Sequence, residues 1–522
     1  MSTSTETADA GVPPAGGPAR ARPPKGDTHR GRWIERWEPD DEQFWEHGAS
    51  RVARKNLIFS IFAEHIGFNI WVLWTIVVIN LANIGIVLSL PEQFWLIAVP
   101  NLVGSGLRIP YTFAIARFGG RMWTATSAAL LLIPALLVAI LVPSGWLAQQ
   151  SHNTQLWVLI LCAATAGVGG GNFSSSMANI SFFYPERKKG LALGLNAAGG
   201  NLGVAVTQLV VPLVIIVGIP AAAVKLPLHH VHLAYAGLLW LPFIVLAVLL
   251  AALYMDSLRQ AKTDTQAYGL AIRNPQTWIV SLLYIGTFGS FIGFSFALPL
   301  VIKNTFPEFL AHHAFIANYL GGLGFLGALI GSLTRPLGGG LSDRVGGARM
   351  TLAAFIGMAA FTLVAIDGVE HRSFTVFFSS FMVIFALTGI GNGSTYRMIP
   401  SIFTALGAKH AEENGLDPKL TALDFKRQAA AVIGIAGSVG AFGGFLIQLV
   451  LRQASLGVTA LVKAAKLPAE KVAVAHAHAS WSTGALWIFI AAYVVLAGMT
   501  WFFYMRKRLA VKRVPSLAYA SV

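Results

Sequence analysis

Arg108 and Arg335 occupy equivalent positions of a sequence that repeats inside apolar stretches. Residues 104–108 (GSGLR) recur as residues 331–335 (GSLTR), so the two arginines lie 335 − 108 = 227 positions apart. The same offset relates residues 117–120 (RFGG) to residues 344–347 (RVGG). A cation inside a membrane helix is costly and is rare without a function. We therefore predict one site, built for an anion and shared between two halves of the chain.

The chemistry of the arginine side chain suits such a site. A guanidinium group stays charged, is planar and offers five N–H donors in a fork, so it can bind a planar oxyanion through paired hydrogen bonds. Two guanidinium groups that face one cavity repel each other until an anion lies between them. The alternative is that backbone carbonyls or a distant carboxylate satisfy each arginine, as happens to an isolated arginine near a helix end. Because both arginines occupy the same position of the repeat, we favour the interpretation that they bind an anion.

Composition places these residues in a membrane. The chain has 522 residues, of which 55% are hydrophobic and 12% charged, about half the charged fraction of a soluble protein. Apolar stretches of about 20 residues recur along it, which predicts an all-α polytopic membrane protein. We attribute the net charge of +15 to basic loops rather than to nucleic-acid binding. The single cysteine, Cys162, excludes a disulfide framework and a cysteine-based metal site.

The apolar pattern predicts twelve transmembrane helices in two repeats of six. The expected spans are 57–81, 93–117, 122–143, 155–184, 190–218, 232–254, 276–302, 314–340, 350–367, 373–404, 427–452 and 480–505. Around them we expect a disordered tail (1–32), an interfacial segment (33–56), an N-terminal bundle (57–254), a cytoplasmic linker (255–275), a C-terminal bundle (276–505) and a basic cytoplasmic tail (506–522).

Further matches extend the repeat. Residues 62–68 match residues 288–294 at an offset of 226, and residues 167–171 (GVGGG) match residues 389–393 (GIGNG) at 222. An even number of spans in each half gives both halves the same orientation, as in the major facilitator fold, where substrate binds between the halves. Lys and Arg gather in one set of loops, with an exception at 453–479, so we expect both termini to be cytoplasmic. For the transporter proposed below we expect the inner, cytoplasmic membrane.

Several other motifs have a structural and a functional interpretation. Glycines recur at helical spacing in four spans, which indicates close helix packing and seams that can slide. Residues 322–327 fit a spaced-glycine dinucleotide pattern but follow no strand, and there is no ATP-binding loop, so no cofactor is expected. Asp343 and Arg344 lie in a short cytoplasmic loop (339–346), where they can bridge helix ends and gate the site.

The sequence leaves open the roles of two groups of ionisable residues. Glu64 and His65 are candidates for proton coupling, but Glu64 could equally pair with a cation near the end of its span. His229, His230, His232, His476 and His478 fall in predicted extracytoplasmic loops, where we expect solvated side chains and no metal site.

Long segments resemble the nitrate/nitrite porter family of the major facilitator superfamily, the NarK/NarU-like transporters. Residues 167–185 are similar to its nitrate signature, and residues 389–397 to the second copy of that signature. Residues 193–203 and 283–293 also resemble the family. The resemblance implies that Arg108 and Arg335 grip nitrate, that the planar anion lies between the aromatic rings of Phe173, Tyr284 and Phe288, and that Asn196 and Asn201 match the signature asparagines.

From the residues and the resemblance together we expect a secondary transporter of nitrate and nitrite, functional as a monomer in the lipid bilayer. Anion binding would neutralise the paired arginines and permit the two halves to rock, which favours exchange of nitrate for nitrite. Nitrate/proton symport is the close alternative. A carrier of another small anion and a non-transporting nitrate sensor are less favoured. We expect no enzyme activity, because no nucleophile–base pair or metal set stands out.

Overall fold

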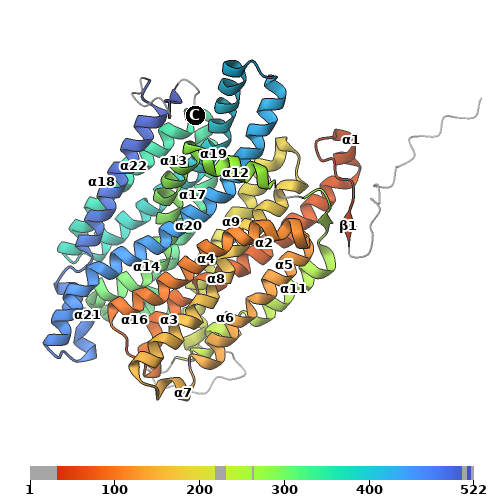
Figure 1. The fold of residues 1–522 in the computed structure, drawn as a ribbon. Coiled ribbons are helices and arrows are strands. Elements are labelled where there is room, and N and C mark those ends of the chain that lie inside the picture. The colour runs from red at the N-terminus through yellow and green to blue at the C-terminus, as the bar shows by residue number, and fades with distance from the viewer. Residues whose placement is uncertain (1–31, 218–230, 262–263, 508–513, 519–521) are drawn as a thin grey trace, which may run out of the picture.

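A computed structural model of the chain describes residues 32–217, 231–261, 264–507, 514–518 and 522. Of the tail predicted over residues 1–32, only Arg32 is among them. The described chain is a bundle of long helices that run side by side (Figure 1). We call the end with α1 (Glu42–Phe44), α12 (Thr265–Arg273) and the C-terminus the α12 face, and the end with α7 (Gly145–Ala148) and α21 (Ala469–His478) the α7 face.

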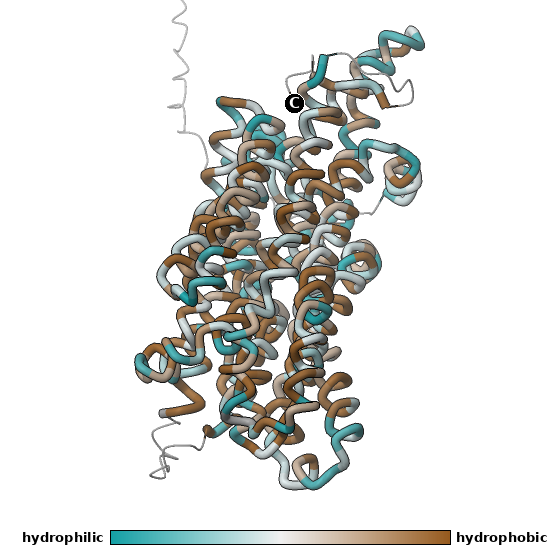
Figure 2. The backbone as a smooth tube through the Cα atoms, turned by 90° about the vertical axis from the view of Figure 1, so that its left-hand side faces the viewer, coloured by the Kyte–Doolittle hydropathy of each residue, from teal (hydrophilic) through white to brown (hydrophobic). Residues whose placement is uncertain are grey.

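Ten helical stretches of the described chain are long and apolar enough to cross a membrane, and hydrophobic segments run along the helices in Figure 2. Two further helices, α4 (Leu90–Phe118) and α17 (Gly324–Val345), have 29 and 22 residues, enough to span about 30 Å of hydrocarbon. They are the helices that carry Arg108 and Arg335, and their prolines, glycines and charges lower their hydropathy. With these two helices the count agrees with the predicted twelve.

Several helices of the N-terminal half are interrupted by one or two residues or by short turns. Their bounds are α2 Ser50–Val72, α3 Trp74–Asn80, α5 Gly120–Leu130, α6 Leu132–Leu136, α8 His152–Phe183, α9 Glu186–Val217, α10 Ala234–Leu238 and α11 Leu241–Tyr254. Short π- or 3₁₀-helical turns lie at Trp45–Ala49, Leu81–Ile84 and Leu137–Leu141.

The helices of the C-terminal half are α13 Pro275–Tyr284, α14 Ser290–Thr305, α15 Pro307–His312, α16 Ala314–Tyr319, α18 Gly347–Glu370, α19 Phe374–Asn414, α20 Pro418–Ala464 and α22 Thr483–Tyr504. A π-helical turn, Ile285–Gly289, joins α13 to α14, and a 3₁₀ turn, Gly321–Leu323, precedes α17.

The segment before the first span is tied to the linker between the halves. Two short parallel strands, β1 (Trp33–Ile34) and β2 (Ser257–Leu258), pair with each other. Ion pairs reinforce this contact at 2.7 Å between Lys55 and Asp256 and at 3.0 Å between Arg259 and Glu35. The pairing was not expected from the sequence, because two-residue strands leave no alternation of apolar residues to detect.

Two loop predictions were wrong. We expected loops at 405–426 and 453–479, but α19 and α20 continue through most of the first as a helical hairpin that projects from the α12 face. At the other end α20 continues to Ala464, and α21 occupies much of the second loop. Hydropathy marks where a helix leaves the hydrocarbon, but alanine, leucine, lysine and glutamate in these stretches favour continued helix.

The two arginine-bearing helices lie where the halves meet. Helix α4 packs against α8 of its own half and α20 of the other, and α17 packs against α19 and also against α9. Glycine permits this approach: a Cβ atom on Gly170 would lie 2.9 Å from the Cα atom of Gly104, and one on Gly443 would lie 2.8 Å from the Cα atom of Gly289. Both of these contacts lie within one half. Between the halves, a Cβ atom on Gly444 of α20 would lie 2.7 Å from the side-chain oxygen of Asn101 on α4, so glycine also lets the two halves approach closely.

Candidate anion-binding site

Arg108 lies fully buried on α4 and reaches across to the other half. Its Nε donates to the carbonyl oxygen of Gly170 on α8 at 3.1 Å, and its Nη1 donates to the carbonyl oxygen of Gly437 on α20 at 2.7 Å. Its Nη2 is buried and has no hydrogen-bond partner. Two backbone carbonyls thus hold the guanidinium in place, and one donor edge is left for a ligand.

Arg335 lies on α17 and is also buried, with 6% of its surface exposed. Its Nη2 donates to the hydroxyl oxygen of Tyr284 at 3.2 Å, and its Nη1 is buried without a partner. Each of the two repeat-related arginines therefore keeps one unpaired donor. An unpaired buried donor costs about 1–3 kcal/mol, more when it is charged, so the arrangement is incomplete without an acceptor.

Two aromatic rings join the arginines into one site. The guanidinium carbon of Arg108 lies 4.5 Å from the ring centre of Phe173 and 5.0 Å from that of Phe288. The guanidinium carbon of Arg335 lies 5.9 Å from each of the same rings. The rings themselves stack, with centres 6.1 Å apart and planes 26° apart. The structure thus brings Arg108, Arg335, Phe173 and Phe288 together, as predicted from the sequence.

Tyr284 completes the predicted aromatic set. Its ring stacks on that of Phe288 at 5.3 Å with the planes 14° apart. The π-helical turn between α13 and α14 contains Phe288 and starts directly after Tyr284. Such turns are frequent at functional sites, because the extra residue redirects the side chains that follow.

No carboxylate of the described residues forms an ion pair with either arginine. Among the described residues neither Arg108 nor Arg335 has an acidic oxygen within 4.0 Å. The aromatic faces offset part of the cost of burying the charges, at about 2 kcal/mol for a desolvated cation–π contact. The remaining positive charge, the flat rings and the two free donor edges are what a small planar anion would satisfy.

Two site residues were missed in the sequence. The ring of Tyr396 on α19 lies 5.7 Å from the guanidinium carbon of Arg335, and its buried hydroxyl has no partner. Trp71 on α2 faces Arg108 at 5.5 Å. Tyr396 falls inside residues 389–397, which resemble the second copy of the family signature, and that resemblance was the available signal. Trp71 lies in an apolar run, where nothing in the sequence distinguished it from a residue of the helix packing.

Neither of the two predicted asparagines forms a hydrogen bond with Arg108 or Arg335 in the described structure. Asn196 on α9 donates from Nδ2 to Oε2 of Glu64 at 2.7 Å and to the hydroxyl oxygen of Ser176 at 2.5 Å. Asn201 is fully buried, and both polar atoms of its side chain lack partners. Asn196 therefore positions a carboxyl group, and its predicted contact with substrate stays a prediction, like that of Asn201.

Glu64 and His65 point to different partners. Glu64 is buried on α2 and accepts hydrogen bonds from Ser176 and Asn196. His65 is half-buried, and its Nδ1 lies 2.9 Å from the carbonyl oxygen of Gly199. No hydrogen bond joins the two side chains in the described structure, so they do not form a carboxylate–imidazole pair.

The gating loop predicted at residues 339–346 was wrong as a loop, because α17 continues to Val345 and these residues form its end at the α12 face. Oδ1 of Asp343 accepts a hydrogen bond from Nε of Arg397 at 2.7 Å, and both side chains are exposed. Asp343 therefore bridges α17 to α19, whereas the neighbouring Arg344 is exposed and forms no such bridge. The equivalent Arg117 of the first half lies against the ring of Phe118 at 5.5 Å.

The histidine predictions have mixed outcomes. His229 and His230 lie outside the described residues. Within the described chain, no group of three His, Cys, Asp or Glu side chains is placed to hold a metal ion. His476 was predicted to be solvated, and this is wrong: it is fully buried on α21, its ring stands edge-on to that of Trp481, and burial lowers its pKa.

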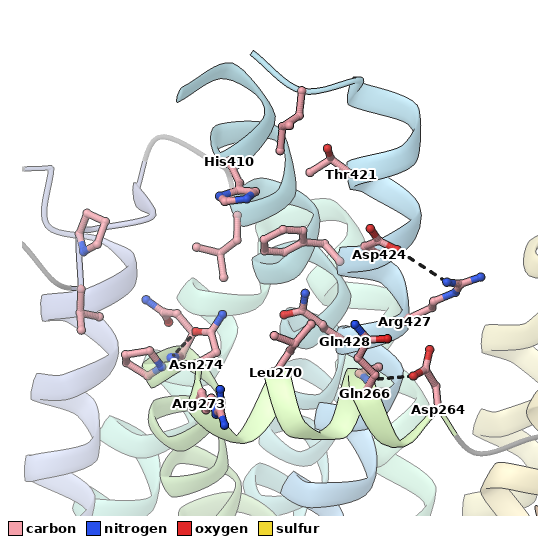
Figure 3. Close-up of a pocket in the computed structure, with 18 residues that line it drawn as sticks. Asp264, Gln266, Leu270, Arg273, Asn274, His410, Thr421, Asp424, Arg427 and Gln428 are labelled. Atoms are coloured by element: carbon pink, nitrogen blue, oxygen red, sulfur yellow. Dashed lines mark hydrogen bonds and ion pairs between the residues drawn. The ribbon is translucent and has the colours of Figure 1, made fainter. Parts of the chain in front are cut away.

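A recess of about 610 Å³ opens elsewhere, between α12 and the projecting hairpin (Figure 3). Charged side chains of both signs line it, among them Arg273, Asp424 and Arg427. Asp424 and Arg427 pair with each other at 3.6 Å. None of the residues around the arginine pair lines this recess, so it is separate from the candidate site.

Comparison with known proteins gives a consistent picture. Residues 57–448 match the Major Facilitator Superfamily. The chain is 34% identical to the nitrate/nitrite transporter NarU of Escherichia coli (strain K12), over 91% of this chain and 97% of that protein. It is 35% identical to NarU of Salmonella typhimurium, over 90% and 96% of the two chains. It is also 28% identical to the nitrite extrusion protein of Bacillus subtilis, over 74% and 83%.

Solved structures support the fold. A D-xylose–proton symporter superposes with a TM-score of 0.57 at 16% identity, covering 85% of this chain and 96% of that one. A bacterial homologue of the lysosomal transporter Spinster gives a TM-score of 0.57 at 14% identity, covering 87% and 96%. At these identities the likeness concerns the arrangement of helices alone.

Proposed function

Because the chain belongs to the nitrate/nitrite porter family of the Major Facilitator Superfamily, a family of transporters rather than enzymes, we propose that it moves nitrate and nitrite across the membrane by alternating access. One observation carries the proposal. Arg108 and Arg335, one from each half, share the rings of Phe173 and Phe288 and each keeps an unpaired buried donor. A planar monovalent anion supplies the missing acceptor to both.

Exchange of nitrate for nitrite follows from the charge of the site. Without an anion, the site brings two guanidinium groups together, and no carboxylate of the described residues forms an ion pair with them. As long as no other negative charge balances them, their repulsion opposes closure of the two halves. A bound anion reduces the repulsion and bridges the halves, which promotes rocking to the other side. Nitrate and nitrite are both small, planar and monovalent, so each can use the same site in turn.

Purified protein in liposomes tests the proposal. With no proton gradient applied, vesicles loaded with nitrite should take up external nitrate, and vesicles without a loaded anion should take up far less. Phosphate should compete poorly, because a tetrahedral, more strongly hydrated ion fits neither the paired rings nor the two free donors. Efficient phosphate competition would point instead to a carrier of other anions, and zero flux with intact nitrate binding would point to a sensor.

We propose that the protein lies in the cytoplasmic membrane with both termini in the cytoplasm, which puts the α12 face inside, because Lys and Arg gather in the loops on that side. We also propose that a single chain is functional, because one chain supplies both arginines and both rings. Labelling of introduced cysteines from either side would test the orientation.

A further inference from the structure

Glu64 is a buried carboxyl group that the arginine grip does not use. Only 1% of its surface is exposed. Its Oε2 accepts hydrogen bonds from Ser176 and Asn196, and its Oε1 is buried without a partner. Both partners are neutral, and no cation of the described chain lies within 4.0 Å. An ionised carboxylate in such surroundings is costly unless a positive charge nearby offsets it.

The charged and titratable groups around Glu64 are few. The helix that carries Glu64 lies against the anion site: Phe68, one turn after Glu64 on α2, has its ring centre 6.2 Å from that of Phe173, and Trp71 faces Arg108 at 5.5 Å. Arg108 and Arg335 are therefore the nearby cations of the described chain, although neither forms a hydrogen bond or ion pair with Glu64. Tyr396 of α19, whose ring lies beside Arg335, also interacts electrostatically with Glu64. His65, the next residue, is turned towards Gly199, and α8 and α9 present the neutral Ser176 and Asn196. The ionisation of Glu64 is therefore coupled mainly to the charge state of the anion site.

We propose that Glu64 takes up and releases one proton in each transport cycle, and that its carboxylate replaces the charge of the anion when the carrier is empty. This inference rests on the proposed function. With Glu64 ionised and no anion, two positive charges and one negative charge leave a net charge of one. With nitrate bound and Glu64 protonated, the same sum holds, because the anion has taken over the negative charge.

Equal charge in the empty and loaded forms allows both to change sides. The proton binds the Glu64 carboxylate as nitrate binds the arginines, and both leave together on the opposite side, so one proton and one nitrate move without net charge. Without a titratable carboxyl group, the empty carrier would hold two uncompensated arginines and only exchange would proceed. Glu64 thus adds net, proton-coupled uptake to the exchange reaction.

Two buried hydroxyl groups can relay a proton over the steps next to Glu64. The hydroxyl of Ser176 donates to Glu64 and lies 3.0 Å from the hydroxyl of Ser60. Ser60 is one helical turn before Glu64 on α2, nearer to the α12 face. Hydroxyl groups both donate and accept, so Ser60 and Ser176 can pass a proton to and from the carboxylate.

Two measurements on liposomes test this inference. For the wild type, an inward proton gradient should drive net nitrate uptake into vesicles without internal anion substrate, and a lumenal pH dye should report proton entry. Glu64→Gln imitates the protonated carboxyl group, so it should lose at least about tenfold of net uptake and all coupled proton entry while nitrate/nitrite exchange persists. Glu370→Gln, at an exposed glutamate at the end of α18, is the matched control and should behave as the wild type.

The results of these assays distinguish failure of this inference from failure of the proposed function. Wild-type net uptake that ignores the proton gradient, or Glu64→Gln that keeps proton-coupled uptake, overturns the inference but leaves exchange standing. Absence of any nitrate flux in the wild type defeats the proposed function itself. If Glu64→Gln loses exchange as well, Glu64→Asp decides: restored proton-coupled uptake supports the inference, and failure to restore it in a correctly inserted protein overturns it.

Discussion

Replacing Arg108 by lysine separates positive charge from the geometry of the guanidinium fork. Arg108 now donates from Nε to Gly170 and from Nη1 to Gly437, and Nη2 is left for the anion. A lysine ammonium is a compact group that cannot hold two carbonyls 3.1 and 2.7 Å from separate nitrogens and also present a third, coplanar donor.

The expected loss follows from the missing donor. One hydrogen bond that involves a charged group contributes about 1.5–3 kcal/mol, so nitrate affinity should fall by about 10- to 150-fold. Titration calorimetry of nitrate binding to purified protein measures this directly, and nitrate/nitrite exchange in liposomes should fall in parallel. Arg349→Lys, at an exposed arginine at the start of α18, is the matched control. Wild-type affinity in Arg108→Lys would refute the planar grip.

Three further changes probe other parts of the structure. Tyr396→Phe removes a buried hydroxyl without a partner, so nitrate should bind about 2- to 10-fold more weakly with an unchanged melting temperature; unchanged affinity would remove this hydroxyl from the site. Gly443→Leu places a Cβ atom 2.8 Å from the Cα atom of Gly289, so the melting temperature should fall clearly, and an unaltered value would contradict the close helix contact. Lys426→Gln removes the exposed 3.2 Å ion pair with Glu186 that joins the halves at the α12 face. It should change stability by less than about 1 kcal/mol but lengthen spin-label distances between the halves at that face, and unchanged distances would rule out a closing role.

The central pair of the site was predictable because its chemistry is unusual in its surroundings. A charged residue in an apolar helix is conspicuous, and duplication of the chain repeated the signal at Arg335. Phe173, Tyr284 and Phe288 were predicted from resemblance and not from periodicity, since an aromatic residue in a membrane helix is ordinarily part of the packing. Their placement together depends on the contact between α8 and the π-helical turn that follows α13, which no single segment encodes.

Other features depend on the fold and left little trace in the sequence. Asn196 was assigned to the substrate by resemblance, yet its amide hydrogen-bonds Glu64 across the gap between α2 and α9. The carbonyl oxygen of Gly437 as a partner of Arg108 was equally hidden, because a backbone acceptor looks the same at every residue. Helix ends were misjudged where α19 and α20 run beyond the apolar stretch, since hydropathy reports the membrane and not the end of the helix.

A structure determined with nitrate bound tests the shared arginine grip most directly. Nitrate should lie beside the rings of Phe173 and Phe288, with its oxygens about 2.7–3.2 Å from one nitrogen of Arg108 and one of Arg335. Nitrate held by only one of the two arginines, or bound at a separate place in the bundle, would contradict a single site built from both halves.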